Sequence, residues 1–92
     1  MIWDLHCHLA GFSGPTPEAQ MANLMRYAGR LSIDRVCVFM GHELLYDPTP
    51  AQLRAQNDEV LAAVRHWPGR AWGFVYLNPN HTQASLDELN RC

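Results

Sequence analysis

The sequence lacks the features that would direct it to a membrane or a nucleic acid. None of its apolar stretches approaches the roughly 18 residues of a membrane span, and no basic segment precedes an apolar run as in a signal peptide. The seven basic residues are scattered and the formal net charge is −2. Such a charge distribution disfavours nucleic acid and anionic membranes as partners. We therefore expect neither of them and favour a small-molecule substrate.

Closely spaced cysteine pairs are also absent. Cys7, Cys37 and Cys92 are odd in number and far apart, and no two of them form a CxxC pair. Cys7 and Cys37 lie within apolar runs, where a free cysteine usually behaves as a small buried hydrophobic residue. The pattern predicts no disulfide and favours a cytoplasmic location.

The chain instead alternates short apolar runs with longer amphipathic patterns. Its 92 residues are 48% hydrophobic and 17% charged, which is typical of a globular protein. Helix starts are marked by Thr16-Pro17 and Thr49-Pro50, with threonine as N-cap and proline in the first turn. Strands are predicted at residues 2–9, 33–40 and 70–77, and helices are predicted to begin at Thr16, Thr49 and Thr82.

The resulting order is βαβαβα, at about 30 residues per strand–helix unit, which predicts an α/β fold with a parallel sheet. A complete (β/α)₈ TIM barrel needs about 250 residues. We predict that residues 1–92 form a single partial domain, the first three βα units of such a barrel; the alternative is a small complete three-layer domain. Three parallel strands alone leave two open edges. Self-association or the remainder of a barrel is therefore the expected protein partner.

The first predicted strand carries an unusual polar face. Side chains two residues apart on a strand share a face, so Asp4, His6 and His8 are expected on one side. Trp3, Leu5, Cys7 and Leu9 are then expected on the other side, packed under helices. Because neutral imidazole is a common metal ligand, we predict that His6 and His8 bind a divalent metal, most simply zinc. The alternative is a polar strand end whose histidines meet solvent.

Other polar residues near strand ends are weaker candidates. Asp4 lies deeper in the strand and is predicted to orient an imidazole rather than bind the metal. Cys7 points away from the expected metal face and is rejected as a ligand or nucleophile. A possible substrate pocket follows the second and third strands, and its candidate residues are His42, Asn78, Tyr76 and His81. For each of these residues, an ordinary loop, turn or packing role is the alternative.

The segment Asp4-Leu5-His6-Cys7-His8 resembles the DxHxH opening of the amidohydrolase superfamily. Further segments resemble the amidohydrolase-related branch of that superfamily, which includes decarboxylases. They are residues 33–38, 57–59, 65–74, 78–79 and 88–91. TatD-like nucleases also open with DxHxH, but they usually carry an acidic residue just after it, where this chain has Leu9-Ala10-Gly11.

The resemblance implies a TIM barrel in which His6 and His8 bind zinc and a metal-bound water hydrolyses a small amide, ester or lactone. Metal-dependent non-oxidative decarboxylation of an aromatic or unsaturated acid is the alternative within this family. The family draws further ligands, two histidines and an aspartate, from later strands that are absent from these 92 residues. We therefore expect this chain alone to be inactive. A non-catalytic, self-associating βα module is the alternative of another class.

Overall fold

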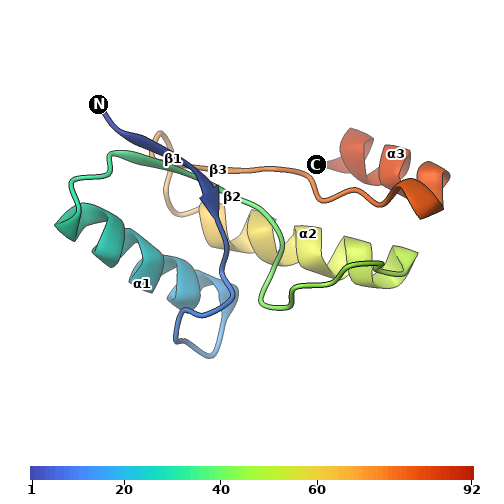
Figure 1. Cartoon of the computed structure of the whole chain (residues 1–92), viewed down its shortest axis with the longest axis horizontal. Helices are drawn as coiled ribbons and strands as arrows, with labels where there is room; N and C mark the ends of the chain where they lie inside the picture. Colours follow the sequence, from blue (N-terminus) through green and yellow to red (C-terminus); the bar gives the residue numbers. More distant parts are fainter.

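The computed structural model describes the whole chain, residues 1–92. Three strands alternate with three α-helices, and a short 3₁₀ helix, η1, precedes the last of them (Figure 1). The elements are β1 (Trp3–Cys7), α1 (Pro17–Arg30), β2 (Arg35–Val38), α2 (Pro50–Val64), β3 (Ala71–Gly73), η1 (Pro79–His81) and α3 (Thr82–Arg91). None of the helices is long and apolar enough to cross a membrane.

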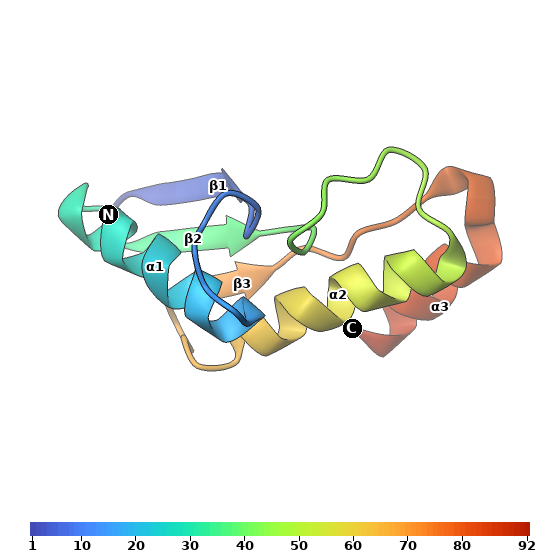
Figure 2. The same cartoon turned by 90° about the horizontal axis from the view of Figure 1, so that it is seen from below.

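The strands form a parallel sheet in the order β1-β2-β3. Helices α1 and α2 lie side by side against one face of this sheet, and no element covers the other face (Figure 2). Helix α3 packs against α2 instead. The molecule therefore has one covered sheet face, which holds the core, and one open sheet face.

Both long helices begin at the predicted threonine caps. The Thr16 hydroxyl accepts a hydrogen bond from the N–H of Ala19 at 3.2 Å. Thr49 and Gln52 form a reciprocal capping box, in which each side chain accepts from the other residue's N–H. These local bonds satisfy helix donors that would otherwise lack partners, so the sequence signals for the helix starts are confirmed.

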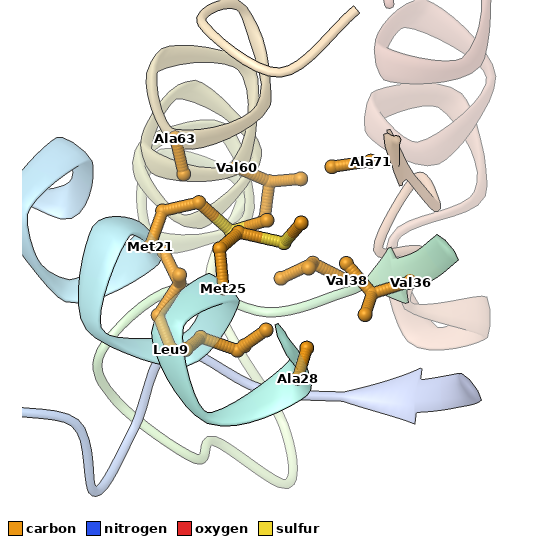
Figure 3. Close-up of a cluster of buried hydrophobic side chains, with 10 residues drawn as sticks. Leu9, Met21, Met25, Ala28, Val36, Val38, Val60, Ala63 and Ala71 are labelled. Carbon is orange, nitrogen blue, oxygen red and sulfur yellow. The ribbon is translucent and has the colours of Figure 1, made fainter. Parts of the chain in front are cut away.

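The hydrophobic core lies between the covered sheet face and the two long helices (Figure 3). Helix α1 contributes a stripe at helical spacing, and α2 contributes Val60 and Ala63. Central strand β2 is buried, as expected for a parallel strand beneath helices. The core residues are Leu9, Met21, Leu24, Met25, Ala28, Val36, Val38, Val60, Ala63 and Ala71.

The predicted opening of a (β/α)₈ barrel is wrong for this structure. The sheet has three strands, it is open at both edges, and its strands are only three to five residues long. A barrel requires strands that continue hydrogen bonding until the sheet closes on itself. The observed fold is a small α/β unit with helices packed on one sheet face.

The third strand is also shorter than predicted. The predicted strand 70–77 pairs with β2 only over Ala71–Gly73, because β2 ends at Val38. Phe74 still donates its N–H to the carbonyl of Val38 at 2.8 Å. Beyond that point the extended chain has no strand neighbour, and one side chain of α2, Asn57, hydrogen-bonds to the backbone of Tyr76 instead.

Candidate metal centre

A bulge in β1 decides which side chains share a face. Between the pairs Asp4–Val36 and Cys7–Val38, β1 advances by three residues and β2 by two. Asp4 and Cys7 both lie beside core valines on the covered face, and His6 lies on the open face. The prediction that Asp4 shares a face with His6 is therefore corrected, because the extra residue interrupts the two-residue alternation.

Two other expectations for this strand are also corrected. Trp3 does not pack under the helices: it pairs with Arg35 and stacks on Trp72 with ring centroids 4.9 Å apart, on the open face. Leu5, in the bulge, is 61% exposed. Cys7 and Leu9 do pack toward the core, as predicted.

The two histidines of the opening segment meet as predicted. His6 Nε2 lies 3.1 Å from His8 Nε2, and their rings meet edge to face. The Phe39 ring lies against both, with centroids 4.9 Å from His6 and 4.4 Å from His8. The strand end thus brings two imidazole nitrogens together beside an apolar ring.

A backbone carbonyl fixes the tautomer of His8. Its Nδ1 lies 2.9 Å from the carbonyl oxygen of Phe39, which can only accept a hydrogen bond. Nδ1 therefore carries the proton, and Nε2 of the neutral ring keeps its lone pair. The next residue, Met40, has a left-handed backbone with φ 62°, which turns the chain sharply after this carbonyl. Metal-binding histidines commonly have this second hydrogen bond.

The spacing of the two nitrogens fits a shared metal ion. Two nitrogens that each lie about 2.0–2.1 Å from one zinc in tetrahedral geometry are roughly 3.3–3.4 Å apart. The observed 3.1 Å requires only a small adjustment. In the absence of a metal, the same distance suits a hydrogen bond from a protonated His6 Nε2 to His8 Nε2.

The chain supplies only these two ligands at this point. No group of three or more His, Cys, Asp or Glu side chains is placed to hold a metal ion. Asp4 Oδ1 accepts from the backbone N–H of His6 at 3.0 Å, so it supports the strand rather than the imidazole. Cys7 packs toward the core instead, and burial, reinforced by Asp4, raises the pKa of its thiol to about 12.

A pocket of about 340 Å³ adjoins the two histidines, and we call it the His6–His8 pocket. It is bordered by the end of β2, by the loop that follows, and by the extended chain after β3. Its lining residues are His6, His8, Phe39, Met40, Leu44, Leu45, Tyr46 and Tyr76. The Tyr76 hydroxyl donates a hydrogen bond to the carbonyl of Leu45.

Of the four predicted pocket residues, only Tyr76 lines this pocket. His42 bonds through Nδ1 to the Glu59 carboxylate at 2.7 Å and borders a different hollow. Asn78 is buried and donates to Asp47 and to the carbonyl of Pro48, an anchoring role. His81 belongs to η1 beside these residues and does not line the pocket.

The residues that sequence reasoning missed are apolar. Phe39 directly follows β2 and lies against the two histidines, and a face assignment for the predicted strand 33–40 would have indicated it. Leu44, Leu45 and Tyr46 belong to a loop, where no periodic pattern predicts which side chains line a pocket. Their contribution depends on how the loop is anchored.

Comparison of the chain with protein-family models, with curated proteins and with solved structures finds no match.

Proposed function

We propose that His6 and His8 are two ligands of a divalent metal, most simply zinc, in a hydrolase that acts on a small amide, ester or lactone. The observation that carries this proposal is the 3.1 Å approach of two Nε2 atoms, one of which has its lone pair fixed by the Phe39 carbonyl. Two solvent-facing histidines that only hydrogen-bond to each other would not need the His8 ring to be held by the Phe39 carbonyl. The DxHxH resemblance of the sequence supports the same assignment.

The chain's residues have distinct parts in this proposal. His6 and His8 would hold the metal, which when bound lowers the pKa of a water ligand and polarises the substrate carbonyl. Phe39 holds His8 in the tautomer that leaves Nε2 free. The apolar lining of the His6–His8 pocket would contact an apolar part of the substrate.

Two histidines bind zinc weakly, because catalytic zinc usually has three protein ligands and a water. Further ligands must come from groups that these 92 residues do not place nearby. We therefore expect the chain alone to bind metal but to show no appreciable turnover.

Metal-dependent non-oxidative decarboxylation of an aromatic or unsaturated acid is the alternative within the same class, because a divalent metal held by His6 and His8 would also bind a substrate carboxylate.

Cobalt(II) binding tests the proposal. Titration of the chain with Co²⁺ is expected to give visible absorption bands that saturate at one metal per chain and that zinc displaces. The bands should be lost in His6→Ala and His8→Ala and kept in the matched control His66→Ala, whose ring lies at the end of α2. Equal binding in all four proteins would refute the assignment, provided that circular dichroism shows each to be folded.

A second candidate function is self-association. The open sheet face exposes Trp3 by 40%, Leu5 by 61%, Trp72 by 39% and Phe74 by 48%. Exposed aromatic groups beside two open sheet edges favour pairing with another copy. Sedimentation that gives a folded monomer at high concentration would exclude this candidate.

We also propose a reducing compartment such as the cytoplasm. All three cysteines are free thiols, two of them at least partly buried. Persistence of the fold under reducing conditions tests this proposal, because it needs no disulfide.

A further inference from the structure

The walls of the His6–His8 pocket carry no formal charge. Apart from the two imidazoles and the two phenols of Tyr46 and Tyr76, every lining side chain is aliphatic, a phenyl ring or a thioether. At about 340 Å³, the pocket has a volume in the range of small-molecule sites. It is large enough for a single ring or a short branched chain.

Several polar atoms at this site already have partners, although the exposed Tyr46 hydroxyl does not. Tyr76 donates its proton to the carbonyl of Leu45, and the carbonyl of Phe39 accepts from His8. The Nε2 atoms of His6 and His8 face each other. No side chain at the far wall carries a charge that could pair with a carboxylate or phosphate, and a charged group there would lose hydration without an ionic partner.

The loop that forms the far wall is anchored at both ends. At its start, the N–H of Gly41 donates to Gln56 Oε1, and the N–H and ring of His42 bond to Glu59. A side chain at position 41 would collide with both acceptors, since a Cβ there would lie 2.1 Å from Glu59 Oε2. At its end, Asn78 bonds to the carbonyl of Pro48.

Between these anchors the loop displays apolar side chains to solvent. Leu44 is 58% exposed and Tyr46 is fully exposed, although both line the pocket. An apolar ligand that covers these side chains would bind favourably, because it removes their apolar surface from water. The anchored loop and its exposed apolar side chains therefore both favour an apolar occupant of the pocket.

We propose that the His6–His8 pocket binds an uncharged apolar group of the substrate, an aromatic ring or branched aliphatic chain, with the bond to be hydrolysed toward His6 and His8. The proposal deepens the hydrolase assignment and rests on it for the reacting bond. Binding of the apolar group itself depends only on the lining and needs no metal.

Three probes of similar shape test it on the metal-free chain: neutral benzamide, anionic benzoate and cationic benzamidine. Binding is followed by changes in amide and histidine ring NMR shifts. Benzamide is expected to shift His6, His8 and Tyr46 saturably and to bind at least about tenfold more tightly than either ion, because desolvation of an unpaired charge opposes binding. Equal affinity for benzoate or benzamidine, or no binding of benzamide, would overturn the proposal.

Two exposed wall residues provide the variants. Leu44→Ser and Tyr46→Ala are each expected to weaken benzamide binding by about fivefold through lost apolar contact. Leu86→Ser, at a similarly exposed site on α3, is the matched control and should leave the affinity for benzamide unchanged. Unaltered affinity in both wall variants would contradict the proposed site. Loss of cobalt binding and loss of benzamide binding are separate results, so failure of this proposal is distinguishable from failure of the metal assignment.

Discussion

The side chain of Asn57 in α2 hydrogen-bonds to both the N–H and the carbonyl of Tyr76, as a neighbouring strand would. Its Oδ1 accepts from the Tyr76 N–H at 2.8 Å, and its Nδ2 donates to the Tyr76 carbonyl at 3.1 Å. The same Nδ2 donates to Glu88 of α3 at 3.0 Å. One buried amide thus joins α2, the chain after β3 and α3, and sets Tyr76 against the His6–His8 pocket.

Replacement of this amide should destabilise the fold. Asn57→Ala is expected to lower the free energy of unfolding by about 2–4 kcal/mol, because the part-buried backbone of Tyr76 loses both partners and buried Glu88 keeps only Arg91. Urea unfolding measures the change. Asn90→Ala, at an exposed site on α3, is the control and should lie within about 0.5 kcal/mol of wild type. Similar stability of both variants would show that the amide does not hold these elements together.

The His42–Glu59 contact should weaken as pH rises. The hydrogen bond to Glu59 raises the pKa of His42 above its ordinary 6.5, against the opposing effect of burial. A raised folded-state pKa gives stability that is fully present below pH 6.5 and is lost as pH rises through the folded value. The contribution is expected to stay below about 1 kcal/mol, because the His42 side chain is 51% exposed.

Comparison with Glu59→Gln between pH 5 and 9 measures this contribution. The stability difference from wild type should shrink as pH rises, and NMR titration should show a lower pKa for His42 in the variant. Asp87→Asn, on α3, serves as the charge-matched control. A difference that stays constant across this range would rule out the linkage.

The cysteines should differ in their reactivity toward iodoacetamide at pH 8. Burial raises the pKa of Cys37 and, to about 12, that of Cys7, so little thiolate is available at either. Cys92 is exposed, although partial burial of its thiol also raises its pKa. Mass spectrometry should therefore find Cys92 labelled first in the folded chain and all three labelled in urea. Early labelling of Cys7 would contradict its placement toward the core.

Truncation of a core side chain beneath the sheet should lower the free energy of unfolding. Met21 is fully buried between α1, α2 and the sheet, and Met21→Ala is expected to cost about 2–5 kcal/mol through lost burial and a cavity. Leu89→Ala, at a 52% exposed site on α3, should change stability much less. Thermal unfolding compares the two variants. Equal shifts would mean that Met21 does not lie in a packed core.

Much of the local structure is predictable from the sequence because its causes are local. Thr16 and Thr49 begin helices through bonds to residues three positions on, and the α1 stripe follows from helical spacing. The approach of His6 to His8 follows from strand alternation after the bulge. Each of these predictions needs only neighbours within one element.

The remaining features depend on contacts between distant segments. The bulge that turns Asp4 to the covered face arises from pairing with β2 and has no signature in residues 2–9. The barrel prediction failed because repeated βα units specify a parallel sheet but not its closure. Asn57 looked like an ordinary helix residue, since its partner Tyr76 lies 19 positions further along the chain.

The metal assignment is tested most directly by zinc titration followed through the ring nitrogens of all five histidines. The Nε2 resonances of His6 and His8 are expected to shift together and saturate at one zinc per chain. The other histidines, His42, His66 and His81, should not change with them. Shifts spread evenly over all five rings, or none at His6 and His8, would contradict a metal site at this strand end.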